Sequence, residues 1–267
     1  MLEAKIVFVG GGNMSEGIIR GIINAGVMEA KQITVCEIIP ERRNYLKEVY
    51  NVNVAAESAE EVKSSNIIFL AVRPQNAEES VLAFKNSLNE DQILVSICAG
   101  IDIDRLQRWT SEKMKIAKVM PNVLIEARHG YSGVCVSDKI TEKDKEIISE
   151  LFSSIGKTMY IPESMFNEFT AYSCAGPAYV MYFLAGLIDA GVETGFSRKD
   201  ATSMAVENLI GSGMMIEATG KNPYQITDTM TSPAGVTIEG CHVLSGSGFQ
   251  GIVMDAVRVA VKRANEF

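Results

Sequence analysis

Three glycines and a serine near the amino terminus have the types and spacing of a phosphate-binding loop. The stretch VGGGNMSEG, residues 9–17, follows a short β-branched run and opens a helical pattern. Gly10 permits a tight turn, Gly12 lets a pyrophosphate approach the backbone, and Ser15 is small where a helix must pack closely on a sheet. The helix N-terminus attracts phosphate oxygens. In this strand–loop–helix context the motif indicates dinucleotide binding, the alternative being a glycine-rich turn without a ligand. The predicted cofactor-binding residues of this loop are Gly10, Gly11, Gly12, Asn13 and Met14.

An acidic residue at the end of the next apolar run, QITVCE, bears on the choice of dinucleotide. Glu37 stands where a carboxylate usually binds the adenosine ribose hydroxyls and repels a 2′-phosphate, which favours NADH over NADPH. Arg42 and Arg43 follow, and they either bind a phosphate or lie on a solvated helix face. The runs NIIFLAV and QILVSICAG end at the same expected sheet edge. Their predicted cofactor-binding residues are Ala71, Val72, Arg73, Pro74, Cys98, Ala99 and Gly100.

A second group of polar residues lies near the carboxyl end, in the stretch TDTMTSPAGVTIEG, residues 227–240. It carries four Thr and one Ser, and it has no charged residue between Asp228 and Glu239. Apolar-rich helical patterns flank it. Taken without a ligand, Thr237 is a helix N-cap and Ser232 a turn residue before Pro233.

The order of the apolar patterns predicts the elements that position these groups. Strands alternating with helices indicate a parallel sheet with helices on both faces. The expected strands are 5–9, 32–37, 66–72, 92–100, 115–120, an edge strand over 131–137, and 157–162. After Pro162 only helical patterns follow, over 177–194, 197–219 and 237–264, with a break at 245–249. We therefore predict an α/β Rossmann-type dinucleotide-binding domain over 1–161 and an all-helical substrate-binding and dimerisation domain over 162–267.

Composition excludes several classes of partner. The net charge of −8 argues against a nucleic-acid groove or an anionic membrane as the main partner. No apolar run is expected to reach the roughly 18 residues of a membrane span, and the amino terminus lacks a signal-peptide pattern, so we predict a cytoplasmic protein. The five Cys lack a C-x-x-C pair and the two His lack ligand-like spacing. Reduced thiols and no metal site are therefore expected.

These motifs together resemble one family, the pyrroline-5-carboxylate reductases, along the whole chain. The matching segments are GGGNM, LAVRP, SICAG, KVMPN, SCAGPAYV, DAGVETGFSR, TSPAGVTIEG and GFQGIVMDAVRVAVKR. The resemblance implies reduction of 1-pyrroline-5-carboxylate to L-proline, the last step of proline biosynthesis, by NADH or NADPH. It also implies a homodimer formed by the helical domain, with dimers often assembling into a decamer.

The same resemblance implies roles for individual residues. Thr237 and Ser232 would supply the catalytic hydroxyls, and the Thr237 hydroxyl would hydrogen-bond the ring nitrogen of the substrate. The N–H groups of Gly235, Val236 and Thr237 would hold the substrate carboxylate. Glu163 would contact the substrate nitrogen, and its alternative is a first-turn helix acid. Ser58 would touch the adenosine end of the cofactor, and its alternative is a helix N-cap.

Several positions depart from the family pattern and leave alternatives open. Cys174-Ala175 replaces a Ser-Gly pair, Val123-Leu124 replaces a Thr-Pro pair, and Ala234 replaces a Gly. These changes allow a related imine reductase that acts on a different ring. A β-hydroxyacid dehydrogenase would need a lysine that is missing between Lys157 and Lys199. A non-catalytic nucleotide-binding relative would not need the hydroxyls that this chain retains.

Overall fold

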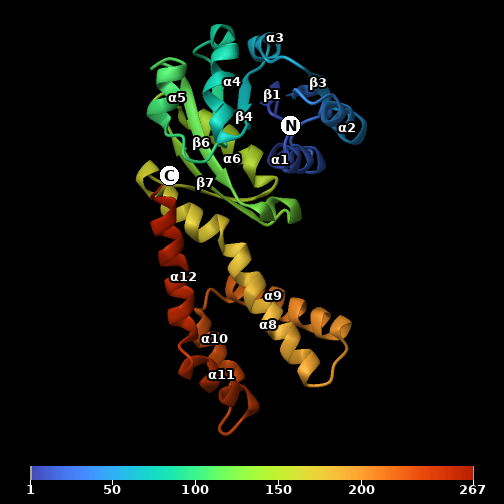
Figure 1. The fold of residues 1–267 in the computed structure, drawn as a ribbon, viewed down its shortest axis with the longest axis vertical. Helices are drawn as coiled ribbons and strands as arrows, with labels where there is room; N and C mark the ends of the chain where they lie inside the picture. The colour runs from blue at the N-terminus through green and yellow to red at the C-terminus, as the bar shows by residue number, and fades with distance from the viewer. Residues whose placement is uncertain (1, 267) are drawn as a thin grey trace. The chain divides into compact units, whose positions relative to one another are not determined.

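The computed structural model describes residues 2–266, which form two compact units (Figure 1). The first unit ends at Cys174, and the second covers Ala175–Glu266. Every strand precedes residue 161, and the described chain after it is helical. The division between residues 161 and 162 that the sequence suggests stays a prediction.

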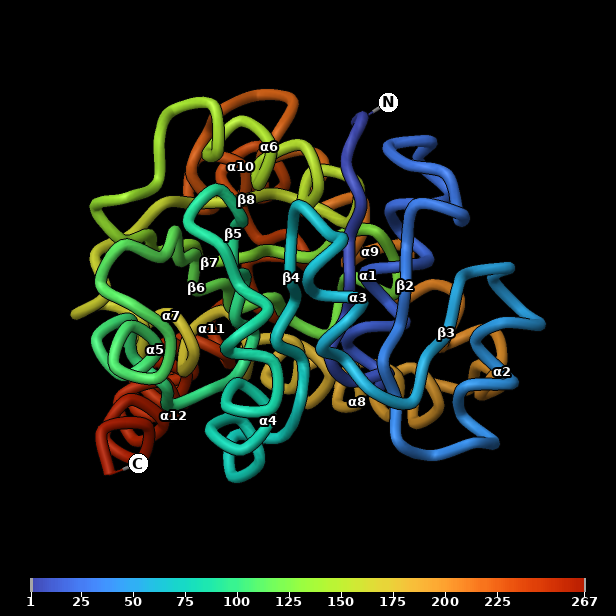
Figure 2. The backbone as a smooth tube through the Cα atoms, turned by 90° about the horizontal axis from the view of Figure 1, so that it is seen from above, coloured from blue at the N-terminus to red at the C-terminus, as the bar shows by residue number. Residues whose placement is uncertain are grey.

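One eight-stranded sheet forms the centre of the first unit. Its order is β3-β2-β1-β4-β5-β6-β7-β8, and Figure 2 shows the strands laid across the unit from β3 to β8. All neighbouring pairs are parallel except β6 with β7. The strands are β1 Ile6–Val9, β2 Ile33–Cys36, β3 Asn53–Ala55, β4 Ile67–Leu70, β5 Ile93–Ser96, β6 Lys115–Pro121, β7 Gly130–Val136 and β8 Gly156–Tyr160.

Two details of the sheet differ from the expectation. The strand β3 was not predicted, because its three residues carry no alternation and it forms only by pairing with β2. The run 131–137 was expected at an edge, but β7 lies between β6 and β8, so that prediction is wrong. The strand β8 pairs with β7 in parallel and is itself the edge strand.

Both faces of the central strands are buried, which explains their uninterrupted apolar sequences. Ile6 and Phe8 of β1 belong to a core with helices α1 and α6, while Val7 and Val9 belong to a core with α4 and α5. The ring of Phe8 stacks on that of Phe69, with centroids 4.4 Å apart. The α-helices of this unit are α1 Asn13–Asn24, α2 Pro40–Tyr50, α3 Ala59–Lys63, α4 Ala77–Phe84, α5 Ile103–Trp109, α6 Glu142–Ser153 and α7 Phe166–Phe169.

Short helical turns complete the first unit. The 3₁₀ turns are η1 Ala30–Gln32, η2 Pro74–Asn76, η3 Lys85–Ser87, η4 Val123–Ala127 and η5 Glu163–Met165. A π-helical turn, η6 Thr170–Cys174, follows α7. Such turns are rare and frequent at functional sites.

The strand order reverses at β1, because β2 and β3 extend to one side and β4 begins the other. In open parallel sheets the crevice outside the carboxyl ends of the strands at this point is the usual place for a ligand. The glycine loop and the residues after β2, β4 and β5 all leave their strands at that edge.

The second unit consists of five helices: α8 Gly176–Glu193, α9 Arg198–Thr219, α10 Pro223–Met230, α11 Val236–Gly246 and α12 Phe249–Ala264. Helices α8 and α9 approach closely, since a Cβ on Gly191 would lie 2.8 Å from the Cβ of Ala201. Few residues of this unit are buried: Leu184, Ala201, Ala205 and Ile226. Large apolar side chains are exposed on every one of its helices. A surface of this kind marks an interaction site.

One helical stretch is longer and more apolar than the sequence analysis expected. Glu163–Glu193 has the length and composition of a membrane-crossing helix, with a window of mean hydropathy 1.3, of which 11% is buried. No charged residue stands between Glu168 and Asp189. By length and composition alone, this stretch therefore meets the test that no run was expected to meet.

Candidate active site

The glycine loop has the backbone that the motif predicts. Gly10 has φ +104°, and a Cβ there would lie 2.5 Å from the carbonyl oxygen of Ala71. Only glycine fits this approach to the end of β4. The Gly10 N–H donates to the Cys36 carbonyl at 2.8 Å, and the Ser15 hydroxyl donates to the Gly10 carbonyl at 2.7 Å. These bonds fix the loop against β2 and α1.

The start of α1 fits a dinucleotide diphosphate. Gly12 is the N-cap, and no side chain caps the helix. A Cβ on Gly12 would meet no atom within 4 Å, so the space beside this residue is open. The N–H groups of Asn13, Met14 and Ser15 have no intrahelical acceptor at this position. They form the donor set that phosphate oxygens need.

The backbone of Gly11 is bound from two sides. Its N–H donates to Oε2 of Glu37 at 2.9 Å, and its carbonyl accepts from Nε of Arg42 at 2.6 Å. Oε1 of Glu37 accepts from the Ile39 N–H at 3.0 Å. Glu37 therefore stands at the predicted ribose position, directly beside the glycine loop.

Neither arginine that follows Glu37 faces solvent freely. Arg42 also binds Oε2 of Glu16 at 2.5 Å, and Arg43 donates to the Glu37 carbonyl at 2.5 Å. The interpretation as a solvated helix face therefore fails for Arg42, whose side chain is 23% exposed, while Arg43 is half-buried with this one bond. Sequence analysis missed Glu16, because its contact with Arg42 depends on how α1 packs against α2.

The other cofactor segments also gather at the carboxyl edge. Arg73 is exposed, and its side chain makes no hydrogen bond or ion pair with the described residues, so its guanidinium is available to a ligand. Cys98 is buried and donates to the carbonyls of Leu70 and Val72, at 3.5 and 3.2 Å. Burial raises the pKa of its thiol to about 11. Cys98 thus joins the ends of β4 and β5 as a neutral group.

The alternatives given for Ser58 and Glu163 describe where the two residues lie, since Ser58 is at an N-cap and Glu163 is in the first turn of η5. Ser58 is the N-cap of α3, but its side chain makes no capping hydrogen bond. The carboxylate of Glu163 is bound rather than free, since its Oε1 lies 3.0 Å from Nζ of Lys118 and accepts from the Ile103 N–H at 3.0 Å. Sequence analysis missed Lys118, which interrupts the apolar run KIAKVM and would have signalled a buried charge.

A buried amide was also missed. Asn122 donates from Nδ2 to the Ser173 carbonyl at 3.1 Å, and its Oδ1 accepts from the N–H groups of Leu124 and Tyr131. The thiol of Cys174 lies 3.9 Å from the Pro121 carbonyl. The end of β6 therefore holds the π-helical turn η6, where the SCAGP motif begins.

The loop before α11 is a tight turn with one strained residue. The Gly235 N–H donates to the Ser232 carbonyl at 3.0 Å, and Ala234 has φ +56°. A Cβ on Gly235 would lie 2.5 Å from Oγ of Ser232. A positive φ disfavours any residue with a Cβ, and the loop nevertheless keeps the turn with Ala234 in it.

Thr237 is not the N-cap of α11. Gly235 caps the helix, Val236 is its first residue, and no side chain provides a cap. The hydroxyls of Ser232 and Thr237 make no hydrogen bond with the described residues. Because the Gly235 N–H is used within the turn, the open donors at this helix start are those of Val236, Thr237 and Ile238.

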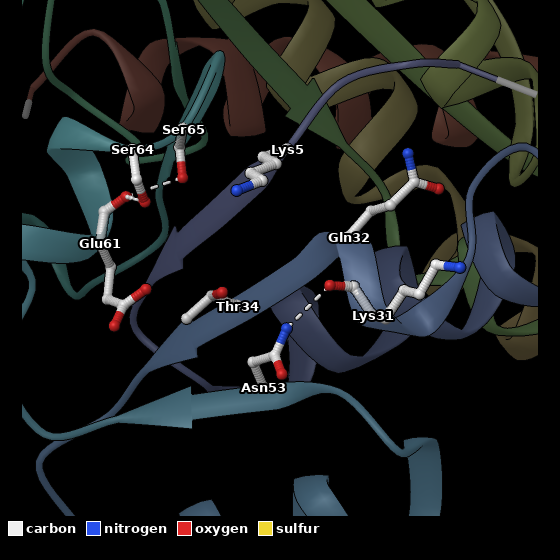
Figure 3. A pocket seen from close by; sticks show the side chains of 8 residues that line it. All are labelled: Lys5, Lys31, Gln32, Thr34, Asn53, Glu61, Ser64 and Ser65. Atoms are coloured by element: carbon white, nitrogen blue, oxygen red, sulfur yellow. Dashed lines mark hydrogen bonds between the residues drawn. The ribbon is translucent and has the colours of Figure 1, made fainter.

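A polar pocket of about 310 Å³ lies elsewhere on the first unit (Figure 3). Lys5 precedes β1, Thr34 lies in β2 and Asn53 begins β3. The pocket is therefore at the amino ends of these strands, opposite to the nucleotide edge. Among the described residues, no group of three or more His, Cys, Asp or Glu is arranged to hold a metal ion.

Two protein-family models match the chain. The one described as pyrroline-5-carboxylate reductase dimerisation covers residues 163–267, and the one described as NADP oxidoreductase, coenzyme F420-dependent, covers residues 5–100. The pyrroline-5-carboxylate reductase of Arabidopsis thaliana is 36% identical over 98% of this chain and 95% of its own length. That of Escherichia coli K12 is 34% identical over 99% and 98%. The chain belongs to the pyrroline-5-carboxylate reductase family.

Solved structures of this family agree. A Plasmodium falciparum pyrroline carboxylate reductase, described with NADP bound, is 30% identical with a TM-score of 0.87, over 99% of this chain and 98% of its own. A pyrroline-5-carboxylate reductase from Coxiella burnetii has a TM-score of 0.93 at 23% identity, over 99% and 98%, and it supports the fold alone.

These comparisons confirm the fold class and the family that the sequence predicted. It makes the protein an NAD(P)H-dependent oxidoreductase acting on the CH–NH group of a small molecule. The match of the helical part to a dimerisation region also shows a protein that self-associates. The roles of the individual site residues stay predictions.

Proposed function

We propose that the protein reduces 1-pyrroline-5-carboxylate to L-proline with a hydride from NAD(P)H. The observation that carries this proposal is the loop before α11. In a chain that aligns from end to end with named reductases of this substrate, that loop presents two unbonded hydroxyls beside the open N–H groups of a helix start. A cyclic imine carboxylate offers the matching groups, an anion and a basic nitrogen.

The glycine loop and α1 hold the dinucleotide, whose nicotinamide supplies the hydride. The first N–H groups of α1 bind the diphosphate, and Arg73 adds a free guanidinium at the next strand end. Glu37 binds the adenosine ribose, and Ser58 contributes an unbonded hydroxyl at that end. Small or apolar contacts to the dinucleotide come from the residues after β4 and β5, which are Ala71, Val72, Pro74, Ala99 and Gly100. Cys98 joins these two strand ends as a neutral thiol.

The substrate binds at the start of α11. The N–H groups of Val236 and Thr237 hold the carboxylate, while Gly235 shapes the turn without lending its own N–H. The Thr237 hydroxyl hydrogen-bonds the ring nitrogen and Ser232 supports it from the turn. Addition of hydride to the imine carbon breaks the C=N π bond and puts an electron pair on nitrogen. That nitrogen takes a proton from water, so the product is a secondary amine.

Positioning is the main contribution of these residues, because holding two reactants in register removes much of the entropic barrier. The hydrogen bond to nitrogen adds electrostatic stabilisation where charge changes during the reaction. Of the Glu163 carboxylate, only Oε2 is left for the predicted contact with the substrate nitrogen, since Oε1 is bound to Lys118 and Ile103.

NADH is the proposed preferred cofactor. The carboxylate of Glu37 accepts two backbone N–H bonds, from Gly11 and Ile39, which hold it beside the glycine loop. A fixed negative charge at the ribose suits two hydroxyls and repels a 2′-phosphate.

A homodimer assembling further into a decamer is the proposed quaternary structure. The exposed apolar side chains of α8–α12 would be covered by a second subunit, which also accounts for the apolar stretch Glu163–Glu193 without a membrane. We accordingly infer a cytoplasmic enzyme.

The decisive experiment mixes the purified protein with pyrroline-5-carboxylate and follows the nicotinamide absorbance with NADH and NADPH side by side. Oxidation of NADH in excess over NADPH is expected. No oxidation with either cofactor overturns the proposed activity, and a strong NADPH preference overturns the role given to Glu37. Faster reduction of a six-membered cyclic imine carboxylate would assign the enzyme to a different ring, in line with the changed Cys174 and Ala175.

A further inference from the structure

A four-residue network lies behind the glycine loop, and it consists of Glu16, Arg42, Tyr45 and Tyr50. Arg42 bridges the Gly11 carbonyl and Oε2 of Glu16. The hydroxyls of Tyr45 and Tyr50 donate to Oε1 of Glu16 at 3.0 and 2.6 Å. The Arg42 guanidinium also lies over the Tyr45 ring, 5.1 Å from its centroid. The Arg42 guanidinium is therefore bound to groups of the protein itself, the Gly11 carbonyl and the Glu16 carboxylate.

Arg42 connects this network to the predicted cofactor site, because it binds the glycine loop. The Glu37 carboxylate binds the N–H of Gly11 and Arg42 binds the carbonyl of the same residue. Both side chains are consequently held at the backbone of one glycine-loop residue, where the adenosine ribose is proposed to bind. In Rossmann folds an arginine beside this position accommodates the 2′-phosphate of NADPH. Here such an arginine is present, but it is bound to Glu16.

The Glu16 carboxylate is well suited to keep Arg42. Both side chains are mostly shielded, with 17% exposure for Glu16 and 23% for Arg42. Burial raises the pKa of Glu16, but the hydrogen bonds from Tyr50, Arg42 and Tyr45 outweigh it and leave the pKa lowered. Glu16 is therefore charged at neutral pH, and three donors fix its orientation.

We propose that Glu16 is a cofactor-selecting residue, which acts by withholding the Arg42 guanidinium from the 2′-phosphate of NADPH. This rests on the proposed use of NAD(P)H with Glu37 at the ribose. The preference for NADH then has two sources, the repulsion from Glu37 and the sequestration of Arg42. Glu16 never touches the ribose in this arrangement, so it is a positioning residue.

The test is the dissociation constant of NADH and of NADPH, measured by fluorescence with the full chain and without imine. Glu16→Gln should strengthen NADPH binding relative to NADH by roughly tenfold, the size of effect of one charge-assisted hydrogen bond. Glu16→Asp keeps the charge but shortens the reach to Arg42, so it should shift the ratio in the same direction. This second variant keeps the test informative should Glu16→Gln fold poorly.

Matched controls separate selection from general electrostatics. Glu41→Gln removes an exposed carboxylate beside Arg42 in the same helix, and it should leave the ratio unchanged. The double variant Glu16→Gln with Arg42→Met should lose the gain for NADPH, because the freed guanidinium is absent.

Three outcomes would overturn the proposal. The first is that Glu16→Gln weakens the binding of NADH and NADPH equally. The second is that Glu41→Gln changes the ratio of the two dissociation constants as much as Glu16→Gln does. The third is that the change in this ratio persists in the double variant without Arg42. A wild-type preference for NADPH would refute the role of Glu37 alone, since the change in ratio still measures Glu16. If the wild-type chain binds neither dinucleotide, the roles proposed for Glu37 and for Glu16 are both refuted.

Discussion

The ammonium of Lys118 lies 3.0 Å from Oε1 of Glu163 and 4.6 Å from the centre of the Phe166 ring. The Lys118 side chain is only 8% exposed, whereas that of Glu163 is 32% exposed. The same Glu163 oxygen accepts from the Ile103 N–H, the first residue of α5. One carboxylate therefore ties β6, the start of α5 and the turn η5 together, directly beyond the SICAG segment.

The first prediction concerns this ion pair. Glu163→Gln should lower the free energy of unfolding by about 3 kcal/mol, because it leaves a buried ammonium without its counter-charge. The double variant with Lys118→Met should recover most of that loss, because it removes the stranded charge. Urea unfolding followed by circular dichroism measures both. The exposed pair Lys113–Glu90 is the control, and Lys113→Met should cost under about 1 kcal/mol. Equal losses at both pairs would contradict the buried role.

Local sequence was sufficient for much of the first unit. The β-branched runs predicted β1, β2, β4, β5 and β6, because strands buried on both faces need uninterrupted apolar residues. Gly10 and Gly12 predicted the loop geometry, since the strand–loop–helix order leaves few conformations for them. The strand β3 escaped because three residues hold no periodic signal.

Contacts between distant residues could not be predicted in this way. The bonds of Arg42 to Gly11 and Glu16 depend on the packing of α2 beside α1, and no local pattern encodes that. Lys118 was visible as a charge in an apolar run, but its partner Glu163 is far away in sequence. The N-cap of α11 was misplaced because a hydroxyl before an apolar run suggested Thr237, whereas the turn of Ser232 to Gly235 starts the helix earlier.

The second prediction concerns Ala234. Its φ of +56° is unfavourable for a residue with a Cβ, so Ala234→Gly should raise the free energy of unfolding by about 0.5–1 kcal/mol, the strain relief exceeding the entropy cost of glycine. The neighbouring change Gly235→Ala should act in the opposite direction, because its Cβ would lie 2.5 Å from Oγ of Ser232. Thermal unfolding measures both. A loss of stability in Ala234→Gly would mean that the turn is not strained.

The third prediction is a pH dependence caused by the Cys98 thiol. Burial raises the pKa of Cys98 from 9.0 to about 11, so the unfolded chain releases this proton first. Stability should therefore fall as the pH rises from about 9 to about 11, with at most ~1.4 kcal/mol per pH unit from this group. Cys98→Ala should give a shallower slope over that range. Val95→Ala, a buried change in β5, the strand that precedes Cys98, should lower stability without altering the slope, and equal slopes in wild type and Cys98→Ala would refute the assignment.

The fourth prediction separates catalysis from helix capping at Thr237. Thr237 is the second residue of α11 and its side chain caps nothing, so Thr237→Ala should change the free energy of unfolding by less than about 0.5 kcal/mol. Turnover of pyrroline-5-carboxylate should nevertheless fall roughly a hundredfold, the loss that follows removal of one positioned hydrogen-bond donor from a reacting group. The dissociation constant of NADH should stay unchanged, and Thr237→Ser should restore most of the turnover because it restores the hydroxyl. Steady-state kinetics, cofactor titration and urea unfolding on the same three proteins measure these quantities. A loss of stability that parallels the loss of turnover would return Thr237 to a structural role at the start of the helix.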